Sequence, residues 1–111
     1  MKRNFIRLVK EEKDGKAIYD TYLTPSMIPL RKLYEAIDIE EESEKGNLSQ
    51  RQLFDMMIDF VVSVYENQFT RDDVLDRLHA PDATEELQSQ IQFVAQGQMD
   101  DERKKELKKM I

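Results

Sequence analysis

Two aspartates in the middle of this 111-residue sequence are the first candidates for chemistry. Asp55 and Asp59 are four residues apart, so on a helix they share one face, as paired carboxylates do in some catalytic and metal-binding sites. A hydrolase that uses this pair is one hypothesis. The alternative is that both residues mark the solvent-exposed face of a helix, with Arg51 pairing with Asp55 one turn away. We favour the second interpretation, because no further catalytic group accompanies the pair.

The other reactive residue types lack the partners that chemistry requires. His79 is the only histidine and there is no cysteine, so a histidine or thiolate metal site has no second ligand of that kind. Residues 38–47, DIEEESEKGN, are rich in carboxylates but lack the alternating aspartates and final glutamate of an EF-hand calcium loop. The sequence therefore predicts a protein that is not an enzyme and that uses no cofactor and no metal.

Charge and composition exclude further classes. The net charge of −6 disfavours a nucleic-acid binder, because phosphate contacts need a basic surface. The apolar runs are too short to span a membrane, and residues 1–10 lack the apolar core of a signal peptide. The absence of cysteine suits a reducing compartment. We therefore expect a cytoplasmic protein whose partners include no nucleic acid and no membrane.

The first part of the chain has the pattern of a β-hairpin. Strand-like runs at residues 3–10 and 16–23 flank the turn signal Asp14-Gly15. A two-stranded hairpin is marginally stable alone, so we expect it to pack on the rest of the chain or on another copy. The sequence predicts this hairpin over residues 3–23.

A helical pattern begins at a proline that follows the hairpin. Pro29 suits the first position of a helix, because its missing N–H has no partner there in any case. We expect the helix to end in a solvated loop at residues 38–47, where like charges crowd together. The apolar residues with helical spacing, which predict packing on one face only, are Leu30, Leu33, Tyr34 and Ile37.

Three more helical segments follow. Ser49 and Thr70 each begin a capping-box pattern, which predicts helices at about residues 50–67 and 71–78. A last amphipathic pattern ends at Gly97, a residue suited to a helix C-terminus.

These patterns together predict a mainly α (α+β) fold. We expect a single domain over residues 1–98, with four helices and the N-terminal hairpin over 3–23. Residues 99–111 form a charged C-terminal tail with few apolar anchors, and we expect it to fray.

The predicted helix at 50–67 has more apolar surface than a surface helix needs. Between Leu53 and Tyr65 the polar residues are Asp55, Asp59 and Ser63, which form one narrow stripe. The short neighbouring segments leave part of this surface uncovered, which favours a groove for a partner. The residues that we expect to bind a partner are Phe54, Met57, Phe60, Val61 and Phe69.

Three stretches of the sequence carry a family resemblance. Residues 22–32 read YLTPSMIPLRK, residues 61–70 read VVSVYENQFT, and residues 72–76 read DDVLD. They stand in the order hairpin, short helix, acidic gap and apolar helix. Over about residues 16–98 the chain resembles the tail assembly chaperones of phages with long, non-contractile tails, especially those that infect Gram-positive bacteria. The Asn-Gln-Phe-Thr junction and the Asp-Asp-Val-Leu after it are the most specific part.

The resemblance implies a function. Members of that family are small, acidic and mostly helical assembly factors, absent from the finished virion. They are thought to coat the tape measure protein and to keep it soluble until tail tube subunits polymerise around it. Many are also made in a longer form by ribosomal frameshifting.

The residues and the resemblance lead to one hypothesis and one alternative. We expect a phage tail assembly chaperone that binds apolar helical segments of the tape measure protein and is displaced by the tail tube protein. Self-association is expected too, because an exposed strand edge and surplus apolar surface favour pairing. The alternative is an acidic inhibitor that mimics nucleic acid and has no enzymatic activity.

Overall fold

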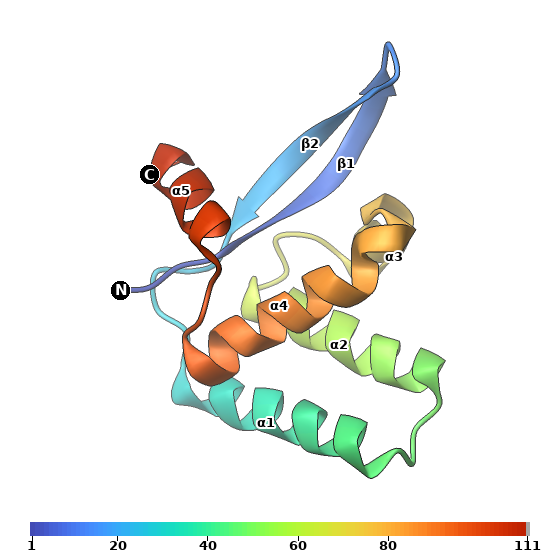
Figure 1. Ribbon diagram of the computed structural model, residues 1–111, viewed down its shortest axis with the longest axis vertical. Coiled ribbons are helices and arrows are strands. Elements are labelled where there is room, and N and C mark those ends of the chain that lie inside the picture. Colours follow the sequence, from blue (N-terminus) through green and yellow to red (C-terminus); the bar gives the residue numbers. More distant parts are fainter. Residues whose placement is uncertain (111) are drawn as a thin grey trace.

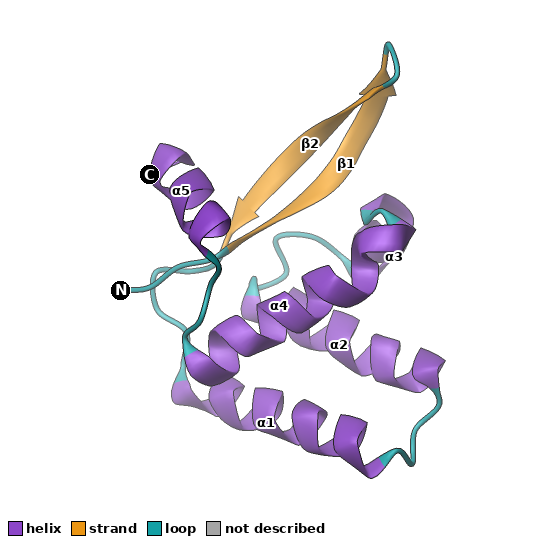
Figure 2. Cartoon of the chain, in the orientation of Figure 1, coloured by secondary structure: helices purple, strands orange, loops and turns teal. Residues whose placement is uncertain are grey.

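The computed structural model describes residues 1–110 and shows a β-hairpin that projects from a group of helices (Figure 1). Figure 2 shows the hairpin on one side of the helices, with the C-terminal helix beside its base. The elements are β1 (Phe5–Lys13), β2 (Lys16–Leu23), α1 (Leu30–Lys45), α2 (Gln50–Val64), α3 (Arg71–Arg77), a 3-10 turn (Ala80–Asp82), α4 (Ala83–Gln96) and α5 (Asp101–Met110).

The α+β class and the hairpin are confirmed, whereas the count of four helices is wrong. The described residues form five α-helices, because the charged tail contains α5 (Asp101–Met110). Within residues 1–110, no helix has both the length and the apolar character that crossing a membrane requires.

The acidic segment at residues 38–47 is helical through Lys45, so its prediction as a loop is wrong. Glutamate has a high helix propensity, and none of the glutamates in this segment is buried, so solvent screens the repulsion between them. Ile39 is buried and anchors this part of α1 on the core. Gly46 ends the helix with a φ of 68°, a left-handed conformation that favours glycine.

The face of α1 that packs on the core differs from the packing face that the apolar spacing predicted. Ala36 and Ile39 form its buried face. Leu30, Tyr34 and Ile37, which the sequence placed on the packing face, are exposed. The small side chain of Ala36 lets this face of α1 approach the core closely. The spacing of apolar residues alone takes no account of side-chain size.

Both predicted capping boxes are present. Ser49 and Thr70 each accept a hydrogen bond from a backbone N–H three residues ahead, and the residue there, Gln52 or Asp73, accepts one in return. The backbone N–H of Thr70 holds the pKa of the Asp73 carboxyl below its usual value. The two helices therefore begin where the sequence predicted.

The helix α2 ends at Val64, three residues earlier than predicted. Glu66 and Asn67 adopt left-handed conformations, with φ of 53° and 60°, which break the helix. The chain then reverses direction and enters α3 at Arg71.

One apolar core joins the base of the hairpin to α1, α2 and α4. From β1, Ile6 and Leu8 are fully buried, so the hairpin docks on the helices through its base. Residues 10–19, the outer half of the hairpin, are all exposed. The other core residues include Ala36, Ile39, Met57, Ile58, Phe60, Val61, Val64, Tyr65, Phe69, Val74, Leu87 and Ile91.

A buried amide links the hairpin to two helices. Gln90 of α4 accepts hydrogen bonds at its Oε1 from Asn4 Nδ2 at 3.2 Å and from the Tyr65 hydroxyl at 2.8 Å. Its Nε2 donates to the Phe5 carbonyl oxygen at 2.8 Å and to Glu86 at 3.1 Å. Burial raises the pKa of Tyr65, so its hydroxyl stays protonated and remains a donor.

Charged contacts hold α5 on this region. The guanidinium of Arg103 donates to Asn4 Oδ1 at 2.9 Å and to the Phe5 carbonyl oxygen, and it forms an ion pair with Glu86 at 3.0 Å. It also lies over the Phe5 ring, 4.4 Å from the centroid. None of the α5 residues is buried, so polar contacts rather than apolar packing fix this helix.

We predict that Gln90→Leu destabilises the protein by about 2–4 kcal/mol, because it leaves the buried polar groups of Asn4 and Tyr65 without their partner. Urea unfolding followed by circular dichroism measures this change in the free energy of unfolding. The control is Gln92→Leu on the exposed side of the same helix, which should change stability by less than about 0.5 kcal/mol. Equal effects of the two substitutions would contradict the role assigned to Gln90.

Candidate partner-binding groove

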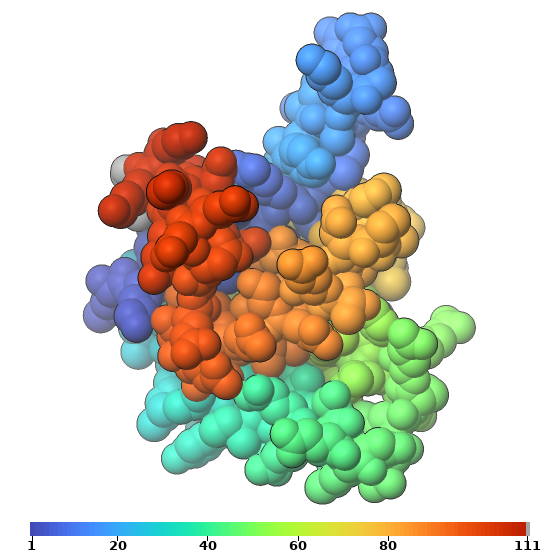
Figure 3. All heavy atoms as spheres, viewed as in Figure 1, coloured from blue at the N-terminus to red at the C-terminus, as the bar shows by residue number. Residues whose placement is uncertain are grey.

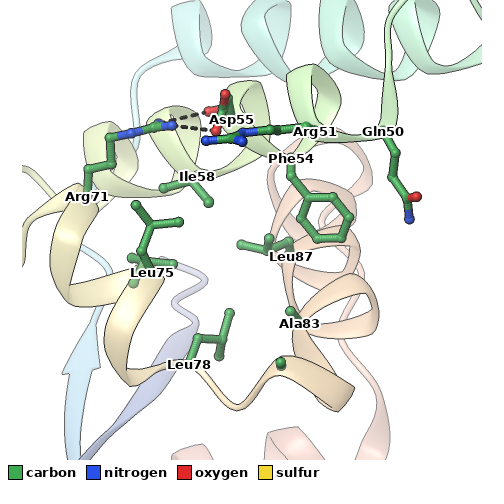
Figure 4. A pocket seen from close by; sticks show the side chains of 12 residues that line it. Gln50, Arg51, Phe54, Asp55, Ile58, Arg71, Leu75, Leu78, Ala83 and Leu87 are labelled. Atoms are coloured by element: carbon green, nitrogen blue, oxygen red, sulfur yellow. Dashed lines mark hydrogen bonds and ion pairs between the residues drawn. The ribbon is translucent and has the colours of Figure 1, made fainter.

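An open groove of about 550 Å³ lies between α2, α3 and the start of α4 (Figure 4). In this view Leu75 and Leu78 stand on one side, Ala83 and Leu87 stand on the other, and Ile58 lies at the α2 end. The residues that line the groove are Gln50, Arg51, Phe54, Asp55, Ile58, Arg71, Val74, Leu75, Leu78, Ala80, Ala83 and Leu87.

The helix α3 forms one wall of the groove. Val74 points into the core and is buried, whereas its neighbour Leu75 is 53% exposed. An exposed leucine at the edge of an apolar groove gains free energy when a partner covers it. The wall therefore offers apolar surface that the chain itself leaves open to solvent.

The polar end of the groove is an ion-pair cluster. Arg71 at the start of α3 binds Asp55, and its Nη1 lies 2.5 Å from Asp59 Oδ1. The hydrogen bond that Arg71 donates to Asp59 is the main cause that raises the pKa of Arg71. Arg71 thus takes the place beside Asp55 that the sequence argument gave to Arg51, and this correction arises because α3 folds back over α2.

The two aspartates therefore have a structural partner. Asp55 and Asp59 fix the position of α3, and the third polar residue of the α2 stripe, Ser63, accepts a hydrogen bond from Lys32 at 3.1 Å. Among residues 1–110 there is no group of three or more histidine, cysteine, aspartate or glutamate side chains placed to hold a metal ion.

A second arginine fixes the other end of α3. Arg77 Nε donates to the Val9 carbonyl oxygen at 2.8 Å, and its Nη2 lies 2.5 Å from Asp20 Oδ2 on the hairpin. The groove wall is therefore held on α2 at one end and on the hairpin at the other. Because these pairs are partly exposed, salt weakens them.

The five predicted partner-binding residues occupy two different environments. Phe54 is half-buried and lines the groove. The other four are covered by the chain itself, because α1, α4 and the hairpin base together enclose most of α2. These four buried residues are Met57, Phe60, Val61 and Phe69.

The sequence argument missed the groove residues on α3 and α4. Leu75 and Leu78 are three residues apart, so they share one face of a helix, and Ala83 begins α4 on the opposite wall. The spacing of the two leucines was a usable signal. The capping residues of this short segment account for where α3 begins, but they carry no information on the face that it exposes.

We predict that Arg71→Gln loosens α3 on α2 while the rest of the fold stays intact. The reason is that Asp55 and Asp59 lose the cation that joins them to α3. Hydrogen exchange should accelerate at the α3 amides and stay unchanged at the α4 amides. The control is Arg51→Gln, which also alters a groove arginine but removes no ion pair found in residues 1–110. Equal exchange rates in the two variants would refute the role of Arg71.

Comparison with known proteins identifies the family. The family model described as phage tail chaperone protein matches residues 1–111, the whole chain. Comparison with curated proteins and with solved structures gave no significant match. The whole-chain match confirms the resemblance seen over residues 16–98 and supports a role in phage tail assembly. The chain belongs to the phage tail chaperone protein family.

Proposed function

We propose that the protein binds apolar helical segments of the tape measure protein in the groove between α2, α3 and α4 and keeps them soluble during tail assembly. The groove itself is the observation that carries this proposal, because it is apolar, open and bordered by charged residues. Membership of the phage tail chaperone family supports the role in tail assembly.

The chemistry of the groove suits an amphipathic helix. Leu75 and Leu78 present apolar side chains over the buried Leu87, and helix-in-groove recognition uses apolar residues of the partner at helical spacing. Because Leu75 is 53% exposed, covering it contributes about 1 kcal/mol, roughly half of what burying a fully exposed leucine contributes. The volume of about 550 Å³ is within the range of ordinary ligand pockets, so the groove accommodates a few side chains of the client.

A small groove gives binding that is reversible. A few apolar contacts give modest affinity, because association costs translational and rotational freedom. Many copies along a long client would then cover it, and tail tube subunits would displace them one by one. Binding of the client and its release to tail tube subunits need no covalent step and no energy source.

The acidic character of the protein helps to keep the complex in solution. The net charge of −6 makes copies repel one another when they cover a client. Asp72 and Asp76 are exposed on α3 beside the groove wall. We place this activity in the cytoplasm of the host cell, where the tail is assembled.

We predict that Leu75→Glu abolishes the solubilisation of a co-expressed tape measure protein, because it places a charge on the apolar wall. Leu75 is exposed in the free chain, so the variant should keep its helical circular dichroism and its unfolding midpoint. The soluble fraction of the tape measure protein after centrifugation is the measurement.

The matched control is Ile18→Glu, because Ile18 is also an exposed aliphatic residue but lies on the outer hairpin. This variant should solubilise the client as well as the unaltered protein does. If Leu75→Glu solubilised the client equally well, the groove would not be the binding site.

We predict that Met57→Asp, by contrast, unfolds the protein. Met57 is 4% exposed and lies in the core, so a carboxylate there is buried without a partner. Circular dichroism and loss of a cooperative urea transition report this outcome. A folded Met57→Asp protein that no longer solubilises the tape measure protein would instead place Met57 at the binding surface.

A further inference from the structure

The helix α1 carries an apolar stripe that residues 1–110 leave partly open to solvent. Leu30 is 64% exposed, Tyr34 is 62% exposed and Ile37 is 38% exposed. Their spacing of four and three residues places them on one face of the helix. Figure 1 shows α1 along the edge of the molecule furthest from the hairpin, and Figure 3 shows its side chains at the surface there. The stripe is therefore open to a second molecule.

Two opposite charges flank this stripe on the same side. Arg31 and Asp38 are both exposed. At 3.6 residues per turn they project in nearly the same direction from the helix axis, separated by about 10 Å along it. That separation is too long for a direct ion pair within one helix, and neither residue forms an ion pair with any of residues 1–110. Both charges are thus free to meet a partner.

We propose that α1 pairs in an antiparallel arrangement with α1 of a second copy of this chain. If a twofold axis passes near Tyr34, Leu30 of each copy covers Ile37 of the other. The same symmetry places Arg31 of each copy beside Asp38 of the other, so two intermolecular ion pairs form. In a parallel pair, by contrast, the charged flanks of the two copies would lie on opposite sides of the interface, so Arg31 of one copy would not meet Asp38 of the other.

The charge pattern favours a second copy over other occupants. The stripe is complementary to itself, both in its apolar centre and in the order of its charges. Antiparallel helix dipoles add to the attraction. The residues of the α1 stripe are not among those that line the groove, so this dimer does not depend on the proposed function.

The expected dimer is reversible. A single helix of 16 residues buries less surface than the roughly 800 Å² per partner of a standard stable interface. We therefore expect dissociation in the micromolar range, which sedimentation equilibrium measures directly. The experiment uses the full chain at concentrations from about 5 to 500 μM, a range that brackets this affinity.

Charge reversal tests the pairing. Arg31→Asp places two carboxylates opposite each other at both ends of the stripe, and Asp38→Arg places two guanidinium groups there. Each variant alone should dimerise more weakly, with a dissociation constant raised at least tenfold. An equimolar mixture of the two variants should form a heterodimer, because each repulsive pair then becomes an attractive one. The double variant Arg31→Asp/Asp38→Arg should dimerise like the unaltered chain.

The control is Glu85→Arg, an exposed charge reversal on α4 that should leave the dimer unchanged. Circular dichroism verifies that every variant is folded. A monomeric unaltered chain, single variants that dimerise as strongly as the unaltered chain, or a mixture that dimerises no more strongly than the single variants would each overturn the proposal. If Tyr34→Glu removed solubilisation of the tape measure protein while the unaltered chain was monomeric, the stripe would belong to the client instead.

Discussion

The hydrogen bonds of Gln90 are the constraint on which the arrangement of the other elements depends. Its amide joins the start of the hairpin at Asn4 and Phe5 to the residue that follows α2, Tyr65. Apolar packing alone fixes no unique register between a hairpin and a helix pair, whereas hydrogen bonds have direction. The same cluster receives Arg103, so the C-terminal helix is positioned by it too.

The groove is built differently from the core beneath it. The core is held by apolar burial, which is insensitive to ionic strength, while the α3 wall is fixed by Arg71 and Arg77. A wall fixed by partly exposed ion pairs moves more easily than one that is packed on both sides. In the proposed function, this division would let the groove adapt to varied apolar segments while the rest of the fold stays rigid.

Local signals in the sequence were sufficient for much of the fold. The capping residues Ser49 and Thr70 located two helix starts, and Asp14-Gly15 located the hairpin turn, because each acts on its immediate neighbours. The length of α1 was misjudged because helix propensity outweighs like-charge repulsion between solvated side chains. Each of these features depends on residues within one helical turn.

The site depends on contacts that a single sequence does not display. The packing of α1 and α4 decides which part of α2 is covered. The spacing of Phe54 and Met57 along α2 therefore could not show that Phe54 lines the groove while Met57 lies in the core. The position of α3 follows from the reach of Arg77 to Val9, 68 residues away. The family resemblance indicated a role in phage tail assembly, which the apolar pattern of α2 alone could not indicate.

The turn between α2 and α3 has a consequence for how the groove can vary among related chains. Glu66 and Asn67 aim the chain back along α2, and the box at Thr70 then fixes the first turn of α3. One residue more or less in this turn would rotate the presented face by about 100°. With one residue fewer, Asp76 would stand where Leu75 stands now, and with one residue more, Val74 would stand there. Turn length alone would therefore change which α3 side chains line the groove, without any substitution within α3.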